Sequence, residues 1–161
     1  MNLEFLYKKQ QEVDNKIAEK GVKLDHYLNL EHRIFAFQCE LMELANEIGF
    51  FKDWKHSHEI NHDAAIKELA DCLAFAFSIG ITKGYDKLVK EIEGYEDLTE
   101  FPYLDLFNNL RNNDLNTIGS YKMALIMLIA IGRKLGFSNA GIIEHYIAKS
   151  NINIQRQEEG Y

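Results

Sequence analysis

The chain has 161 residues, 47% hydrophobic and 27% charged, which suits one folded domain with a sizeable core and excludes a disordered chain. Its longest apolar run, residues 123–131, is far shorter than the roughly 20 residues that a membrane-spanning helix needs. The net charge of -7 excludes a broad basic surface for nucleic acid. No secretory signal is seen at the start, and Cys39 and Cys72 both lie in apolar segments, so we expect a cytoplasmic protein whose two thiols are reduced and lie in the core.

Helices dominate the expected secondary structure. The sequence has one proline, Pro102, and most of its glycines separate segments with helical apolar spacing. This spacing predicts helices at about residues 3–20, 31–48, 63–83, 117–135 and 139–156. Candidate terminating glycines are Gly21, Gly49 and Gly84, and candidate N-caps are Asp63, Thr117 and Ser138.

Two stretches are less regular. Residues 52–63 are polar and predict a loop or a short helix, and residues 85–116 predict one or two short helices. No repeat, low-complexity tract or flexible linker divides the chain, so we expect one all-α domain over residues 1–161. Helices with broad apolar faces must bury them against one another, which makes a helical bundle the expected architecture.

Acidic residues spaced three apart occur four times, about as often as chance predicts for 25 acids in 161 positions. The four pairs are Glu40 and Glu43, Glu68 and Asp71, Glu93 and Glu96, and Asp97 and Glu100. The last two pairs lie in a charged stretch typical of a solvated face. In contrast, residues 34–51 carry no charge except Glu40, Glu43 and Glu47, and Asp71 is the only charge between residues 70 and 81. The first two pairs are therefore the candidates for a site.

The chemistry of these two pairs indicates a metal site. Positions three apart are neighbours on a helix, so each pair projects to one side. A buried ionised carboxylate must be neutralised, paired or bound to a metal. Helix bundles build divalent-metal sites from facing carboxylates, and ligand sets made only of oxygen suit Mg²⁺. The alternative is a solvent-facing acidic stripe, whereas a di-iron site is disfavoured because neither pair has a histidine at its second position.

Basic and aromatic residues flank the acidic pairs. Lys52, Trp54 and Lys55 lie between them, and the tryptophan is either a core residue or a stacking partner for a planar ligand. Near the C-terminus, Tyr146, Lys149, Asn153 and Arg156 share one helical face. Lys149 and Arg156 fit a phosphate site, although bases also favour the end of a helix without any ligand.

The histidines at positions 56, 58 and 62 could suggest a metal cluster. No cysteine or further histidine completes a tetrahedral set nearby, and the stretch is polar, so we interpret them as surface residues.

The sequence resembles a known enzyme family. Glu40-x-x-Glu43, 24 intervening residues and Glu68-x-x-Asp71 are similar to the motifs of the all-α nucleotide pyrophosphatases, the MazG-like superfamily. Two further segments resemble the dimeric dUTPases within it. One is the Phe-Lys-x-Trp-Lys segment, here residues 51–55, and the other is a C-terminal block, Tyr-x-x-Lys-Asn-x-x-Asn-x-x-Arg-Gln-x-x-Gly-Tyr, here residues 146–161.

Two positions depart from that family's pattern. Ser150 stands where the family commonly has asparagine. The family's Gln-x-x-Leu-Asn, which helps to recognise uracil, is here Gln10-x-x-Val13-Asp14, and an ionised aspartate accepts hydrogen bonds but cannot donate them.

The resemblance implies a homodimer that hydrolyses dUTP, and also dUDP, to dUMP with Mg²⁺. It implies that Glu40, Glu43, Glu68 and Asp71 hold the metal and that Glu43 activates water. By the same resemblance the phosphate and sugar contacts are Lys149, Asn153, Arg156, Lys52 and Lys55, and the base contacts are Gln10, Asp14 and Trp54. Two alternatives remain: a related pyrophosphatase acting on dCTP or another nucleotide, and a catalytically silent helical interaction protein.

Overall fold

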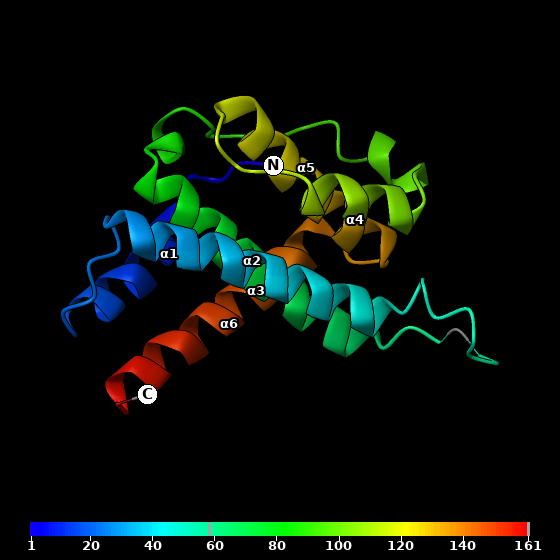
Figure 1. Cartoon of the computed structure of the whole chain (residues 1–161), viewed down its shortest axis with the longest axis horizontal. Coiled ribbons are helices and arrows are strands. Elements are labelled where there is room, and N and C mark those ends of the chain that lie inside the picture. The colour runs from blue at the N-terminus through cyan, green and yellow to red at the C-terminus, as the bar shows by residue number, and fades with distance from the viewer. Residues whose placement is uncertain (58, 161) are drawn as a thin grey trace.

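The computed structural model describes residues 1–57 and 59–160, and these residues form six α-helices and two short 3₁₀ turns (Figure 1). The α-helices are α1 (Glu4–Ala18), α2 (Tyr27–Ile48), α3 (His62–Thr82), α4 (Tyr103–Arg111), α5 (Ile118–Lys134) and α6 (Asn139–Glu158), and the 3₁₀ turns are η1 (Tyr85–Lys87) and η2 (Asp97–Glu100). Extended pairing in the described part of the chain is limited to one isolated bridge between Asn2 and Glu91. The predicted all-α helical bundle is confirmed.

The helix ends follow local capping chemistry. α2 begins four residues earlier than expected because the ring of His26 accepts a hydrogen bond from the Leu28 N–H at 3.3 Å. It ends at Gly49, whose φ of 70° a residue with a side chain rarely adopts. α5 begins with a reciprocal capping box between Thr117 and Ser120, so the predicted N-cap at Thr117 is confirmed.

The predicted N-cap of the third helix, Asp63, is wrong. Asn61 takes that position, and its Oδ1 accepts a hydrogen bond from the Ala64 N–H at 3.2 Å. Asp63 lies instead in the first turn of α3, where a negative charge complements the positive end of the helix dipole. Ser138 caps α6 as expected, because its Oγ accepts a hydrogen bond from the Gly141 N–H at 3.0 Å.

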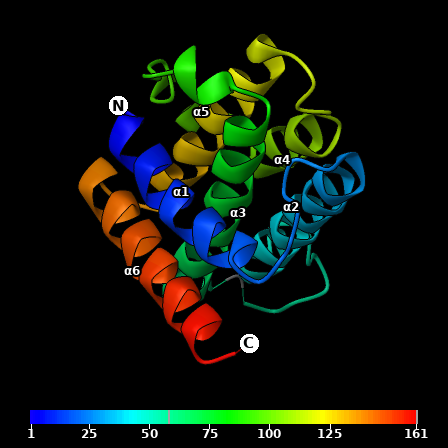
Figure 2. The ribbon, with the colours of Figure 1, turned by 90° about the vertical axis from the view of Figure 1, so that its left-hand side faces the viewer.

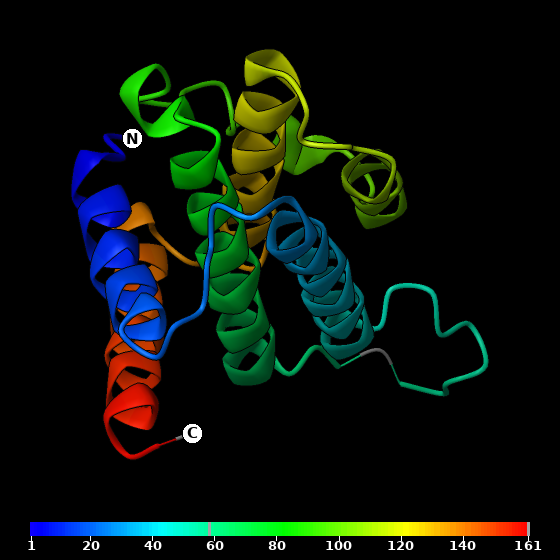
Figure 3. The ribbon, with the colours of Figure 1, turned by 60° about the vertical axis from the view of Figure 1, so that its left-hand side comes forward.

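Helix α3 lies at the centre of the bundle. It packs against α1, α2, α5 and α6, and Figure 3 shows it between α2 on one side and the pair α1 and α6 on the other. Twelve residues of α3 are buried, which fits a helix that is apolar almost all round. Cys72 is one of them, whereas Cys39 on α2 is exposed, so the prediction of two core thiols is wrong for Cys39. Its Gly80 allows a close approach, because a Cβ there would lie 2.1 Å from the hydroxyl oxygen of Tyr121. The central helix therefore places its few polar side chains inside the bundle.

The chain termini and the connections surround this centre. α1 and α6 lie side by side along one face (Figure 2), so the two ends of the sequence build one wall of the molecule. Residues 52–57 and 59–61 form turns and irregular backbone, in agreement with the loop alternative for that stretch. Residues 85–116 contain η1, η2 and α4, as short helices were expected there.

Among the described residues, no single helix is long and apolar enough to cross a membrane. The pair α5 and α6, which is bent by 108°, reaches that length and composition only when the two helices are taken together.

Candidate functional site

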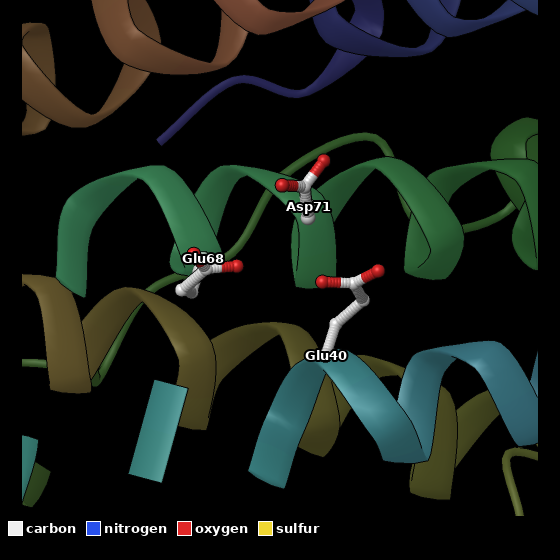
Figure 4. Close-up of side chains that lie close together, drawn as sticks. All are labelled: Glu40, Glu68 and Asp71. Atoms are coloured by element: carbon white, nitrogen blue, oxygen red, sulfur yellow. The ribbon is translucent and has the colours of Figure 1, made fainter. Parts of the chain in front are cut away.

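Helices α2 and α3 bring three carboxylates together. Glu40 projects from α2, and Glu68 and Asp71 project from adjacent turns of α3 (Figure 4). One ligand oxygen from each residue lies within 4.8 Å of the others. The two helices make the most extensive contact in the bundle, which fixes these side chains opposite one another. We call Glu40, Glu68 and Asp71 the carboxylate cluster.

Burial and mutual repulsion make the cluster electrostatically unfavourable as it stands. Burial raises the pKa of Glu40 to about 7, with further contributions from the charges of Asp71, Glu43 and Glu68. The pKa of Glu68 is raised by burial and then by the charge of Asp71. Burial also raises the pKa of Asp71, against the opposing effect of Lys149. A divalent cation would relieve this repulsion, and the oxygen-only donor set fits a hard cation.

Glu43 and Glu47 lie at the edge of this arrangement. Glu43 is exposed on α2 and is not one of the three residues whose oxygens converge. Its negative charge nevertheless contributes to the raised pKa values of Glu40, Glu68 and Asp71. Glu47, one turn further along α2, contributes to the raised pKa of Glu68. Both carboxylates therefore lie within electrostatic reach of the cluster.

Helix α6 supplies cationic side chains beside the cluster. The Lys149 Nζ lies 2.5 Å from the Asp71 Oδ2, and Asp71 is only 9% exposed. The charge of Arg156 also lowers the pKa of Asp71. Lys149, Asn153 and Arg156 line a pocket of about 440 Å³ that Glu40 and Asp71 line as well. Two of the four acidic candidates, Glu40 and Asp71, thus share one pocket with the α6 candidates, whereas Glu43 and Glu68 are not among its lining residues.

The same pocket is lined by two buried polar residues of α1, Gln10 and Asp14, each 4% exposed. Gln10 donates from Nε2 to the Asp14 Oδ1 at 2.9 Å. Burial raises the pKa of Asp14, while the hydrogen bonds from Gln10 and Ser78 and the charge of Arg33 act in the opposite direction. The hydroxyl of Tyr146 lies 3.1 Å from the Gln10 Oε1. These contacts hold the two α1 side chains in place.

Three of the predicted contacts are not among the residues that line this pocket: Lys52, Trp54 and Lys55. The Nζ of Lys52 donates to the carbonyl of Asn46 at 2.7 Å. Trp54 is 72% exposed, and among the described residues its ring contact is a T-shaped one with Phe51. These side chains lie on the loop after α2, which projects away from the bundle (Figure 3).

Ser150, the other departure from the family pattern, is buried. Its Oγ donates to the carbonyl of Tyr146 one turn earlier, at 2.9 Å. The hydroxyl thus pairs with the backbone of its own helix, and Ser150 does not line the pocket, whereas Lys149, Asn153, Arg156 and Gln157 of α6 do.

Sequence reasoning missed Arg33 and Ser78, which also line the pocket. Arg33 is 7% exposed and donates from one terminal nitrogen to the Ser78 Oγ at 2.6 Å. A signal was present, because Arg33 precedes the buried residues Phe37 and Leu41 by one and two helical turns and therefore occupies a core-facing position of α2. A charged residue on a core stripe is unusual enough to mark a polar site.

Among the residues described, the histidines of positions 56–62 form no metal site. His56 and His62 are exposed, as expected, and His62 Nδ1 lies 3.0 Å from the carbonyl of Leu135. His58 and Tyr161, the last residue of the C-terminal motif, lie outside the described residues. The group of potential metal ligands found in the described part of the chain is the carboxylate cluster.

A helical bundle that gathers carboxylates, a lysine and an arginine around one pocket is typical of enzymes that act on phosphate-containing substrates with a divalent cation. The comparison with protein families makes this specific. The model of the dUTPase family matches residues 2–161, and the chain therefore belongs to the dUTPase family, whose activity is the hydrolysis of dUTP. A comparison with curated proteins gave no match.

Proposed function

We propose that this dUTPase hydrolyses dUTP to dUMP and pyrophosphate with Mg²⁺ bound at the carboxylate cluster. The observation that carries the proposal is the convergence of Glu40, Glu68 and Asp71 within 4.8 Å beside a pocket lined by Lys149 and Arg156. Bound Mg²⁺ supplies positive charge to the phosphate oxygens and makes water more acidic. We include dUDP as a substrate because it contains the same anhydride bond between the α and β phosphates.

Each carboxylate has a role in this proposal. Glu40, Glu68 and Asp71 hold the cation, and Glu43 completes the metal ligands and accepts the proton of the attacking water. The influence of Glu43 on the pKa values of the other three supports its place near them. Its exposure leaves it free to meet both solvent and substrate.

The α6 residues are proposed to bind the phosphates and the sugar. Lys149 and Arg156 offer cationic donors, and Asn153 offers an amide between them on the same helical face. In the structure Lys149 pairs with Asp71, so a cation at the cluster would release the lysine toward the phosphates. Lys52 and Lys55 are proposed to assist from the loop after α2.

The base is proposed to contact Gln10 and Asp14 at the α1 side of the pocket, with Trp54 as a stacking partner. Support for the first two is their burial in the pocket wall. For Trp54 the proposal requires the loop to approach the pocket when substrate binds, since the ring is 72% exposed.

A homodimer is also part of the proposal. Helix α2 carries an exposed apolar stripe on which Leu28, Phe35 and Met42 follow one another at intervals of seven residues, with Phe35 67% exposed. Seven-residue spacing keeps side chains on one helical face and is typical of helix-to-helix contacts between subunits. A second copy that covers this face would lie on the helix that carries Glu40.

Initial rates for dUTP, dUDP, dCTP and dTTP at equal Mg²⁺ concentration test this proposal. We expect dUTP and dUDP to be hydrolysed to dUMP and the other two nucleotides to be poor substrates. Preference for dCTP would replace the proposed base specificity, and indifference to every nucleotide, with no stabilisation by Mg²⁺, would favour the silent interaction protein.

A further inference from the structure

A chain of hydrogen bonds crosses the base side of the pocket and joins three helices. Arg33 on α2 donates to the Ser78 Oγ on α3 at 2.6 Å, and the Ser78 hydroxyl donates to the Asp14 Oδ2 on α1 at 2.8 Å. Gln10 donates to the other oxygen of Asp14 at 2.9 Å. All four side chains line the pocket.

With Asp14 ionised, the direction of each hydrogen bond in this chain is fixed. An arginine has only donors, so Ser78 must accept from Arg33 and must use its single proton for Asp14. Asp14 therefore accepts on one oxygen from Ser78 and on the other from Gln10, which orients the Gln10 amide with its nitrogen toward Asp14. The hydroxyl of Tyr146 lies 3.1 Å from the Gln10 Oε1 and 3.1 Å from the carbonyl oxygen of Leu6, and these contacts hold it beside the amide.

The guanidinium of Arg33 is held in place by several hydrogen bonds, so it can fix the direction of the hydrogen bonds that follow it. The same terminal nitrogen that reaches the Ser78 Oγ also donates to the Ser78 carbonyl at 3.2 Å. The other terminal nitrogen donates to the Thr82 Oγ1 at 2.9 Å and to the carbonyl of Leu24. Arg33 is only 7% exposed, and a guanidinium with several hydrogen bonds in a buried residue has little freedom to rearrange.

The order matters because uracil and cytosine present opposite edges. At neighbouring ring positions uracil offers a carbonyl acceptor and an N–H donor, whereas cytosine offers an amine donor and a nitrogen acceptor in reversed order. Within the described part of the chain, the network leaves the second amide N–H of Gln10 and the remaining lone pairs of Asp14 for a ligand. The Gln10 N–H is then a donor beside the acceptor oxygens of Asp14. If this order cannot reverse, the pair can form hydrogen bonds with only one of the two base edges, and the other edge would place donor against donor and acceptor against acceptor.

We propose that Arg33, acting through Ser78, is a positioning residue for base specificity: it locks the donor and acceptor order of Gln10 and Asp14, and so makes the pocket accept uracil and reject cytosine. This inference rests on the proposed function of the pocket as a dUTP site. It assigns Arg33 no contact with the reacting atoms.

The test compares Ser78→Ala with Ser78→Thr, because the first removes the hydroxyl and the second keeps it. We measure kcat and KM for dUTP and for dCTP with Mg²⁺. For Ser78→Ala we expect the dUTP to dCTP ratio of kcat/KM to fall at least about tenfold, since rejection by misplaced polar groups is worth that much or more. We expect the loss to appear mainly as a higher KM for dUTP, and Ser78→Thr to retain most of the wild-type ratio.

A second pair of variants tests the arginine directly. Arg33→Lys keeps the charge near Asp14 but loses the fork that reaches Ser78 and Thr82 together, so it should also lower the ratio. The matched control is Arg133→Lys on α5, because Arg133 donates to the Phe137 carbonyl and does not line this pocket. A purely structural role for Arg33 would lower stability or total activity and leave the ratio unchanged.

The outcomes separate the two proposals. A wild-type protein that fails to hydrolyse dUTP overturns the proposed function and this inference with it. Wild-type dUTP hydrolysis with an unchanged dUTP to dCTP ratio in Ser78→Ala and Arg33→Lys overturns the inference alone. A ratio in Ser78→Thr as low as that in Ser78→Ala also overturns it.

Discussion

Replacing Glu40 by glutamine should stabilise the metal-free protein. Burial and the charges of Asp71, Glu43 and Glu68 raise the pKa of Glu40 from 4.5 to about 7. The folded state therefore resists ionisation of this carboxyl more strongly than the unfolded state does, and ionised Glu40 lowers the free energy of unfolding. Glutamine keeps the shape of the side chain and removes the charge.

The size of the gain follows from the pKa. Each tenfold change in an ionisation constant corresponds to about 1.4 kcal/mol, so the full displacement is worth roughly 3 kcal/mol. Solvent screening of the partly exposed carboxylate reduces the expected gain to about 1–2 kcal/mol. For a chain of this length that corresponds to an increase in Tm of about 3–6 °C.

The gain should depend on pH with a definite sign. An acid whose pKa is raised by folding destabilises the folded state above the folded pKa and has no such effect below the unfolded pKa. We therefore expect the full gain at pH 8, a gain that falls as the pH decreases through 7, and no gain once the pH is well below 4.5. Thermal denaturation with EDTA, with Glu31→Gln at an exposed position of α2 as the control, measures this. Equal effects of the two variants, or a gain that grows toward acid pH, would refute the reasoning.

Further predictions concern the other site residues and the core. Glu43→Ala should abolish dUTP turnover and leave the far-UV CD spectrum unchanged; substantial residual turnover would reject Glu43 as the base. Lys149→Met should raise the KM for dUTP and lower the stability of the metal-free protein by about 1–2 kcal/mol, because Asp71 loses its ion pair; an unchanged Tm would show that the pair contributes nothing. Gly80→Ala should cost about 1–3 kcal/mol, measured by urea unfolding, because the new Cβ would lie 2.1 Å from a buried tyrosine hydroxyl. Gly119→Ala, whose Cβ would meet only one atom at 3.9 Å, is the control, and equal costs would contradict the packing argument.

The helices could be predicted because their signals are local. Apolar periodicity and capping residues lie within a few positions of the elements they define, as the cap at Thr117 and the terminal Gly49 illustrate. The error at Asp63 has the same origin, since Asn61 and Asp63 are both good caps and the choice between them depends on where the loop enters the helix.

The carboxylates could be identified as candidates because charges are rare in the apolar segments around them. Their convergence depends on the packing of α2 against α3, which spacing along the chain does not specify. The network of Arg33, Ser78 and Asp14 was harder to foresee, because its members lie 45 and 64 positions apart along the sequence and only the tertiary fold brings them together.

Trp54 is a residue that the sequence singles out as a ligand contact but that the structure places outside the pocket. Its aromatic character and its position between the acidic segments indicate a ligand contact, but local sequence does not determine how a loop lies relative to a pocket. In the structure the ring is exposed on a loop that leaves the bundle. Binding of substrate is the event that would have to bring it to the base.

The most direct measurement of the central claim is product analysis of dUTP hydrolysis with Mg²⁺ and with EDTA. The proposed function predicts dUMP and pyrophosphate in equal amounts with Mg²⁺ and no turnover with EDTA. Turnover that persists in EDTA, or products that are dUDP and phosphate, would contradict it.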